Sequence, residues 1–206
     1  MSKDIDRLMQ MIVRQQGRVT TKEVEAYGFR REVLGKMVKE GRLIREARGV
    51  YLLPDALPDI YVILQHSCSK AVFSYETALW MHGVIRQQPD MISLTVQQGS
   101  NITRLKKTCT NMNVHYVQPA YLEIGAEQMA SPLSGKTITV YNKERCICDL
   151  VRSHHYKSRE QQDIKSYTQA LKIYFAGPDK NLQRLQQYAH QYGIEDQVYS
   201  YMEFLM

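Results

Sequence analysis

The sequence lacks the long hydrophobic runs that mark membrane and secreted proteins. No apolar stretch among its 206 residues approaches the roughly 18 residues needed to cross a bilayer. The first residues, MSKDIDRLMQ, carry charges but neither an apolar block nor a small-residue cleavage site, so they are not expected to form a signal peptide. We therefore expect a cytoplasmic protein with no membrane partner. Hydrophobic residues still make up 44% of the chain, which is enough to build a globular core.

Cysteine and histidine are few, and their spacing does not suit a metal. The four cysteines are far apart except for Cys146 and Cys148, which are separated by one residue instead of the two that zinc and redox motifs require. None of the six histidines has metal-ligand spacing to a second histidine or to a cysteine. We expect reduced thiols, no metal and no other cofactor; a metal site at the Cys146–Cys148 pair is the less favoured alternative.

The short motifs of common enzyme classes are also missing. The chain has no glycine-rich phosphate loop, no GxGxxG, no HExxH and no GxSxG. Asp149 is the one carboxylate whose neighbours could support chemistry, since Glu144, Arg145 and Arg152 lie close to it in sequence. An aspartate between apolar neighbours on a helix is more often a cap or an ion-pair partner than a catalyst. We therefore predict a protein that is not an enzyme and has no catalytic residues.

Positive charge is concentrated in the first quarter of the chain. Residues 1–53 contain 12 Lys and Arg against 7 Asp and Glu, a net charge of +5, whereas residues 54–206 contain 15 against 14, a net of +1. This asymmetry favours a polyanion as the partner of the N-terminal segment, although a basic solvated surface would give the same count.

The first quarter has the pattern of three short helices. The first is predicted to begin after an N-cap at Asp4 and to stop near Gly17; its apolar residues recur at helical spacing, and they are Ile5, Leu8, Met9, Ile12 and Val13. A second, short helix should begin near Thr21, because Thr20 and Glu23 have the spacing of a capping box, and Gly28 should end it.

The third helix is predicted to run from about Arg30 to Glu40. Leu34, Met37 and Val38 would face inward, and the outward face would carry Glu32, Gly35, Lys36 and Lys39. Two helices joined by a tight turn with a glycine are typical of the helix-turn-helix. The second helix of such a pair normally lies in the major groove and presents its N-terminal residues to base edges.

The segment GRLIREARGVYLL, residues 41–53, reads as a hairpin. Two apolar runs flank a polar turn, and Gly49 would supply the backbone freedom that the turn needs. A basic hairpin that directly follows a recognition helix is typical of the wing of a winged helix. Order, spacing and charge together favour DNA binding, although a three-helix element with a hairpin can also serve protein contacts.

Nine residues are therefore predicted to contact double-stranded DNA. The start of the second helix suits a phosphate, because free backbone N–H groups point outward there, and its residues are Thr20, Thr21 and Lys22. Arginine and lysine pair with guanine O6 and N7, so the candidates for base edges are Arg30, Arg31 and Lys36, with Lys39 on the same face. The wing residues Arg45 and Arg48 are predicted to contact phosphates.

The remaining chain is predicted to form a second domain. The segment LLPDALPD, residues 52–59, has two prolines and two aspartates, so we place domains at 1–53 and 54–206. Strand patterns occur in MISLTVQ, NVHYVQP and KTITVYN, and helix patterns in FSYETALWMHG, in KERCICDLVRSH and from Arg159 onward. The expected fold class is α+β: an N-terminal winged helix-turn-helix followed by a mixed α/β domain that ends in helices.

Two further groups of residues have a less specific pattern. Tyr75 and Trp80 lie on the predicted FSYETALWMHG helix and are expected to be core residues. The basic residues Arg104, Lys106 and Lys107 follow a Gly/Asn turn; they could bind nucleic acid, but a solvated loop is the favoured interpretation.

Several of these segments, in this order, resemble the AbiEi family of type IV antitoxins. They are GRLIREARGVYLLP, FSYETALWMHGV, PDMISLTVQQGSN and YNKERCICDLVR, so the resemblance extends over most of the chain. It implies a role in abortive infection and phage defence. The N-terminal domain would repress its own operon by binding inverted repeats, and the C-terminal domain would counter a nucleotidyltransferase toxin, AbiEii, without a stable toxin complex.

The functional prediction is thus an antitoxin that is also a transcriptional autorepressor. The alternative is a one-component transcriptional regulator whose C-terminal domain senses a small ligand. A third hypothesis, an enzyme that reverses the toxin's modification, would depend on Asp149.

Overall fold

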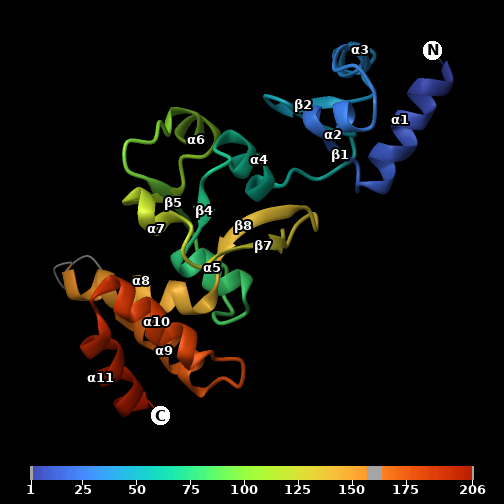
Figure 1. Ribbon diagram of the computed structural model, residues 1–206. Helices are drawn as coiled ribbons and strands as arrows, with labels where there is room; N and C mark the ends of the chain where they lie inside the picture. Colours follow the sequence, from blue (N-terminus) through green and yellow to red (C-terminus); the bar gives the residue numbers. More distant parts are fainter. Residues whose placement is uncertain (1, 157–163, 206) are drawn as a thin grey trace. The chain divides into compact units, whose positions relative to one another are not determined.

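The computed structural model describes residues 2–156 and 164–205 (Figure 1). For residues 2–4, 154–156 and 164–167 it describes the backbone alone. The chain forms two compact units. The first unit contains residues 1–69, 102–108 and 130–138, and the second contains the other segments, 70–101, 109–129 and 139–206. The first unit thus includes the whole predicted N-terminal domain and parts of the later chain. A functional boundary at residue 53 remains a prediction.

The N-terminal part of the first unit has three helices and a three-stranded antiparallel sheet. The elements are α1 (Ser2–Arg14), β1 (Arg18–Thr20), α2 (Thr21–Ala26), α3 (Glu32–Lys39), β2 (Ile44–Ala47) and β3 (Val50–Leu52). The sheet order is β1-β3-β2, so β3 lies in the middle. The three predicted helices and the hairpin are confirmed, whereas β1 is an addition that the local sequence pattern did not indicate.

One apolar core holds these elements together. Its fully buried members come from all three helices, from β1 and from the start of the hairpin, and they include Leu8, Ile12, Val19, Val24, Leu34, Met37 and Leu43. The predicted stripe of α1 was partly wrong. Val13 is 60% exposed and Met11 is buried, because positions 8, 11 and 12 share one helix face and position 13 is turned away from it. Helix α1 also begins at Ser2, before the predicted N-cap Asp4.

Three segments from later in the chain complete the first unit. They are α4 (Ile60–Ser67), α6 (Thr103–Thr108) and the turn between β7 (Ala126–Ala130) and β8 (Thr137–Tyr141). Asp59 connects two of them. One of its carboxylate oxygens accepts from the amides of Tyr61 and Val62 at the start of α4, and the other accepts from the hydroxyls of Ser131 and Ser134. This fully buried carboxylate therefore has partners on both oxygens, as burial of a charge requires.

The second unit is organised around a five-stranded mixed sheet of order β6-β5-β4-β8-β7. Strands β5 (Ile92–Gln97) and β6 (Met112–Val117) are parallel, β4 (Val72–Phe73) is antiparallel to β5, and β4 is parallel to β8. The three predicted strands are confirmed as β5, β6 and β8. The short β4 and the exposed β7 were not predicted, because neither has a clear alternating pattern.

Helices make up the rest of the second unit. They are α5 (Tyr75–Met81), α7 (Pro119–Leu122), α8 (Lys143–Tyr156), α9 (Ile164–Ala176), α10 (Leu182–Tyr192) and α11 (Glu195–Leu205). Helix α8 packs against α5 and α10, and its buried face is the predicted one, with Ile147, Leu150 and Val151. The predicted start of the next helix at Arg159 lies outside the described residues.

Two expectations about single side-chain groups were wrong. Residues Arg104, Lys106 and Lys107 do not lie in a loop: they lie on helix α6, which Leu105 anchors because its side chain is completely buried. Tyr75 and Trp80 are half-buried and are not fully buried core residues.

Candidate nucleic-acid interface

The start of α2 has the predicted capping box. The Thr20 hydroxyl accepts from the Glu23 amide at 3.2 Å, and the Thr20 amide donates to the Glu23 carboxylate at 2.6 Å. The next amide, that of Thr21, donates to the Gly49 carbonyl at 2.9 Å. Both threonine amides are therefore bound inside the chain, and the exposed cation among the three residues predicted to contact phosphate is Lys22.

The capping glutamate has a second partner that the sequence did not indicate. The Lys136 ammonium, in the turn between β7 and β8, donates to Glu23 at 2.8 Å and to the Gln15 side chain at 3.0 Å. Burial alone would raise the pKa of Glu23, but the Lys136 ammonium and the Thr20 amide together lower it below its ordinary value. The β7–β8 turn thus anchors the helix that precedes α3.

Helix α3 presents the predicted basic face to solvent. Arg30 and Arg31 precede the helix and Lys36 and Lys39 lie on it, all four exposed. Gly35 lies on the same face, and a Cβ atom there would have nothing within 4 Å. Packing therefore does not require glycine at this position, and its effect is that no side chain protrudes from the surface there.

Two of these cations pair with exposed carboxylates. Arg31 lies 3.4 Å from Glu32, and Lys36 lies 3.7 Å from Glu40. Exposed ion pairs of this kind contribute only about 0–1 kcal/mol and are screened by salt. They therefore exchange readily for an external anion, and the face remains able to bind phosphate.

The hairpin β2–β3 carries the two remaining predicted residues. Arg45 lies on β2 and Arg48 in the turn; both are exposed, and the described part of the chain offers neither of them an ion-pair partner. Gly49 has φ +81°, and a Cβ atom there would lie 2.8 Å from the His66 ring of α4. Backbone conformation and this close approach both require glycine, so the position of the turn against α4 is fixed.

Not every N-terminal arginine is available to a ligand. Arg18 is 2% exposed; its guanidinium donates twice to Glu46, at 3.1 Å each, and to the Leu57 carbonyl at 2.8 Å. Such a paired, buried guanidinium holds β1 to β2 and to the segment that follows β3.

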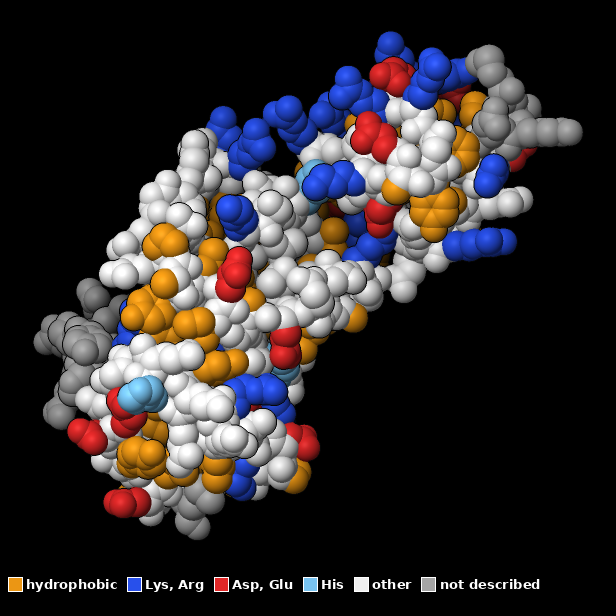
Figure 2. Space-filling view, in the orientation of Figure 1, with side chains coloured by type: hydrophobic (Ala, Val, Ile, Leu, Met, Phe, Trp, Pro, Cys, Tyr) orange, Lys and Arg blue, Asp and Glu red, His pale blue; other side chains and the backbone are white. Residues whose placement is uncertain are grey.

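Lys and Arg side chains gather over α3 and the hairpin in the space-filling view (Figure 2). The first unit has a further basic group on α6, where Arg104, Lys106 and Lys107 are all exposed and the helix has no acidic residue. The structure therefore places all the predicted lysines and arginines on solvent-facing surfaces of the first unit. In the described residues, no group of His, Cys, Asp and Glu side chains could hold a metal ion, and none of the described helices is long and apolar enough to cross a membrane.

A known protein family matches the N-terminal part of this chain. A family model described as "Transcriptional regulator, AbiEi antitoxin" matches residues 6–54, which include α2, α3 and the hairpin and all but the start of α1. The predicted resemblance to the AbiEi family is confirmed over this range. No curated protein matches the chain.

A solved structure resembles this chain over most of its length. It is the crystal structure of the RV2827C protein from Mycobacterium tuberculosis, with a TM-score of 0.50 and 11% sequence identity. The similarity covers 96% of this chain and 80% of the mycobacterial one. At this identity the two proteins are comparable in fold alone.

Proposed function

We propose that residues 1–53 form a winged helix-turn-helix that binds double-stranded DNA, and that the protein is a transcriptional autorepressor and the antitoxin of a type IV toxin–antitoxin system. One observation carries the proposal. The family model of regulators and antitoxins matches residues 6–54. The same range contains α2, α3 and the β2–β3 hairpin, whose predicted lysines and arginines are exposed to solvent.

On DNA, α3 would lie in the major groove. Arg30 and Arg31 at its N-terminal end and Lys36 on its outward face would reach guanine edges, and Lys39 would follow the backbone. Arg45 and Arg48 of the wing would contact phosphates beside the groove. Lys22, next to Thr20 and Thr21, would bind the phosphate on the other side of α3.

The DNA target would be inverted repeats in the promoter of the protein's own operon. An inverted repeat needs two copies of the winged element, which two monomers bound cooperatively supply as well as a preformed dimer does. Occupancy of the repeats would repress transcription of the operon.

The antitoxin activity would reside in the later part of the chain. Its partner would be a nucleotidyltransferase toxin encoded beside it, and protection would proceed in the cytoplasm without catalysis and without a stable complex. The family resemblance of the FSYETALWMHGV and YNKERCICDLVR segments supports this assignment.

A paired assay of the full chain tests both halves. The protein would be co-expressed with the neighbouring nucleotidyltransferase gene, with growth reporting protection and a promoter–reporter fusion reporting repression. The Arg45→Ala/Arg48→Ala variant should lose repression and keep protection. An Arg86→Ala/Lys172→Ala variant, which removes two exposed cations from the second unit, is the matched control and should keep repression. Loss of both activities in a folded wing variant would contradict separate functions, and failure of the wild type to protect would refute the antitoxin assignment.

A further inference from the structure

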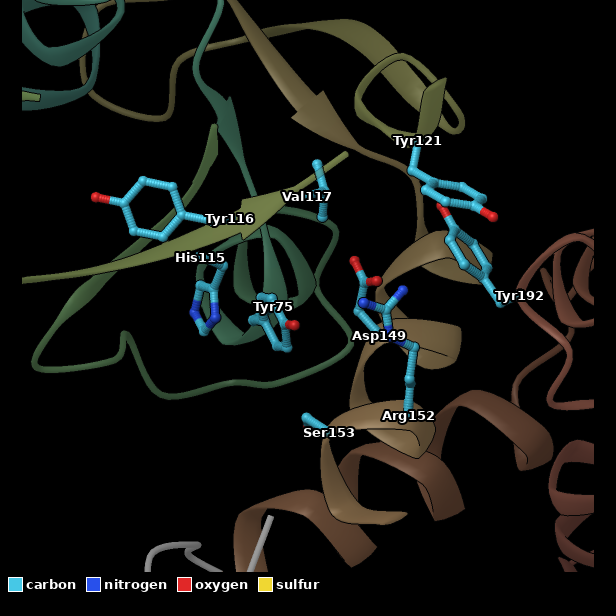
Figure 3. A pocket seen from close by; sticks show the side chains of 9 residues that line it. All are labelled: Tyr75, His115, Tyr116, Val117, Tyr121, Asp149, Arg152, Ser153 and Tyr192. Atoms are coloured by element: carbon cyan, nitrogen blue, oxygen red, sulfur yellow. The ribbon is translucent and has the colours of Figure 1, made fainter. Parts of the chain in front are cut away.

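The second unit contains a cavity of about 550 Å³ that DNA binding does not use. It lies between β6 and α5 on one side and α8 and α10 on the other (Figure 3). The side chains that matter here are Tyr75, His115, Tyr121, Asp149, Arg152 and Tyr192. A cavity of this volume is in the range that small-molecule sites occupy.

Aromatic rings form two walls of the cavity. The rings of Tyr75 and His115 stack with centroids 3.8 Å apart and an angle of 22° between their planes. The rings of Tyr121 and Tyr192 lie 5.1 Å apart in a tilted arrangement. Figure 3 shows the first pair facing Asp149 and Arg152 and the second pair beside them. Walls of this kind suit a flat ligand, because a planar π-system gains from stacking on aromatic faces.

The backbone conformation of Tyr75 is costly for its residue type. Its φ is +49°, in the left-handed region that bulky side chains rarely adopt. Glycine or asparagine would meet the needs of the turn between β4 and α5 more easily. Residues held in such conformations cluster at ligand sites, and here the conformation brings the tyrosine ring to the cavity wall.

A buried charge pair forms the polar side of the cavity. Asp149 is 4% exposed and accepts from Arg145 Nε at 2.9 Å. A second nitrogen of Arg145, Nη1, donates to the carbonyls of Tyr121 and Ile124, at 2.7 and 2.6 Å. Burial raises the pKa of the Asp149 carboxyl, although the Arg145 guanidinium opposes that rise. The predicted ion-pair role of Asp149 is thus confirmed, and the same carboxylate also lines the cavity.

Two buried polar groups beside the cavity have no hydrogen-bond partner within the described structure. They are Nη2 of Arg145, a residue that is completely buried, and the hydroxyl of Tyr192. An unpaired buried donor costs free energy that folding normally avoids. The polar side of the cavity therefore has hydrogen-bonding capacity that the described chain does not use.

Arg152 supplies the charge of the site. It projects from α8 beside Asp149, and its guanidinium lies 5.5 Å from the centre of the Tyr192 ring (Figure 3). It is half-buried, so its charge is accessible from the cavity. Guanidinium groups at such positions bind phosphate bidentately.

We propose that this cavity binds a purine nucleotide. The base would stack on the Tyr75–His115 wall, its amino group would donate to Asp149, and its phosphate would accept from Arg152. A flat, amino-bearing ring joined to an anion is the ligand that matches the aromatic walls, the carboxylate and the guanidinium together. The site is independent of the proposed DNA contacts, and it provides a place in the chain for ligand sensing.

Calorimetric titration of the full-length protein with GMP and AMP tests the proposal, with UMP, guanosine and inorganic phosphate as comparison ligands. The wild type should bind the purine nucleotides more tightly than UMP, and phosphate alone should not reproduce the binding. Arg152→Gln should weaken nucleotide binding about tenfold or more and leave guanosine binding unchanged, because only the phosphate contact is lost. Tyr199→Ala, at an exposed tyrosine of α11, is the control and should bind as the wild type does.

Tyr75→Gly tests the aromatic wall. Glycine relieves the backbone conformation but removes a half-buried ring that stacks on His115, so the variant should melt below the wild-type temperature, remain folded by circular dichroism, and lose nucleotide binding. The proposal would be overturned if neither GMP nor AMP bound the wild type at millimolar concentration. Binding of these nucleotides by the folded Tyr75→Gly protein with wild-type affinity would also overturn it. If that variant does not fold, equal loss of GMP and guanosine binding in Arg152→Gln would be the contrary result.

Discussion

Replacing the wing residues Arg45 and Arg48 with alanine should change the salt dependence of DNA binding by a calculable amount. Both side chains are exposed, and within the described residues neither has an ion-pair partner, so each is free to neutralise one phosphate. On B-DNA each such contact contributes about 0.9 to the slope of log affinity against log salt, so the double variant should lose about 1.8. Between about 50 and 200 mM salt, the advantage of the wild type should therefore shrink about 12-fold.

The assay is fluorescence anisotropy of a labelled promoter duplex, titrated with the full chain at several KCl concentrations. Because neither arginine is buried, the free energy of unfolding should change by less than ~0.5 kcal/mol, and urea denaturation checks this. The Arg86→Ala/Lys172→Ala control removes the same charge from the second unit and should leave the slope within error of the wild type. An unchanged slope in the folded wing variant would refute the placement of these arginines on phosphates.

Three further predictions concern contacts inside the two units. Thr20→Ala removes the capping box of α2 and should lower the free energy of unfolding by about 1 kcal/mol in urea titrations; no loss would contradict the capping role. Lys136→Gln removes the partner that lowers the pKa of Glu23, so the variant should be less stable than the wild type at pH 7, and this difference should shrink as the pH falls through the lowered pKa and Glu23 becomes protonated; a difference that stays as large in acid as at pH 7 would argue against this linkage. Arg145→Met leaves Asp149 buried without its partner and should cost about 3–5 kcal/mol, measured by urea denaturation; a cost below about 1 kcal/mol would mean that the carboxylate is paired elsewhere.

The N-terminal elements could be predicted because local signals determine them. The Thr20–Glu23 capping box and the glycine of the β2–β3 turn act within a few residues, and both are present as expected. The apolar stripe on α1 was predicted with one wrong residue, because neighbouring apolar residues compete for one helix face and only packing decides between Met11 and Val13.

Features that depend on distant parts of the chain escaped prediction. The bond between Glu23 and Lys136 joins residues 113 positions apart, and no pattern near either one indicates it. Arg18 was counted with the N-terminal positive charge, but its pairing with Glu46 removes it from the surface. In both cases the local sequence shows a charged residue and does not show which partner folding brings to it.

The cavity of the second unit shows the same limit. Tyr75 was expected in the core because it lies at the start of an apolar helix, and its left-handed backbone conformation cannot be read from residue type. His115 comes from a strand that was predicted correctly, but its stacking on Tyr75 depends on how α5 packs on the sheet. Asp149 was singled out from its charged neighbours, and the aromatic walls around it were not.

The most direct test of the central claim is the affinity of the full chain for its own promoter, measured against a duplex of equal length and composition with the inverted repeats scrambled. At about 150 mM KCl a specific repressor should prefer the promoter by about 10³-fold or more, and Arg31→Ala, on the face assigned to base edges, should reduce that preference more than it reduces binding to the scrambled duplex. Equal affinity of the wild type for the two duplexes would contradict the account, because the basic surface of α3 and the wing would then bind polyanions without reading a sequence.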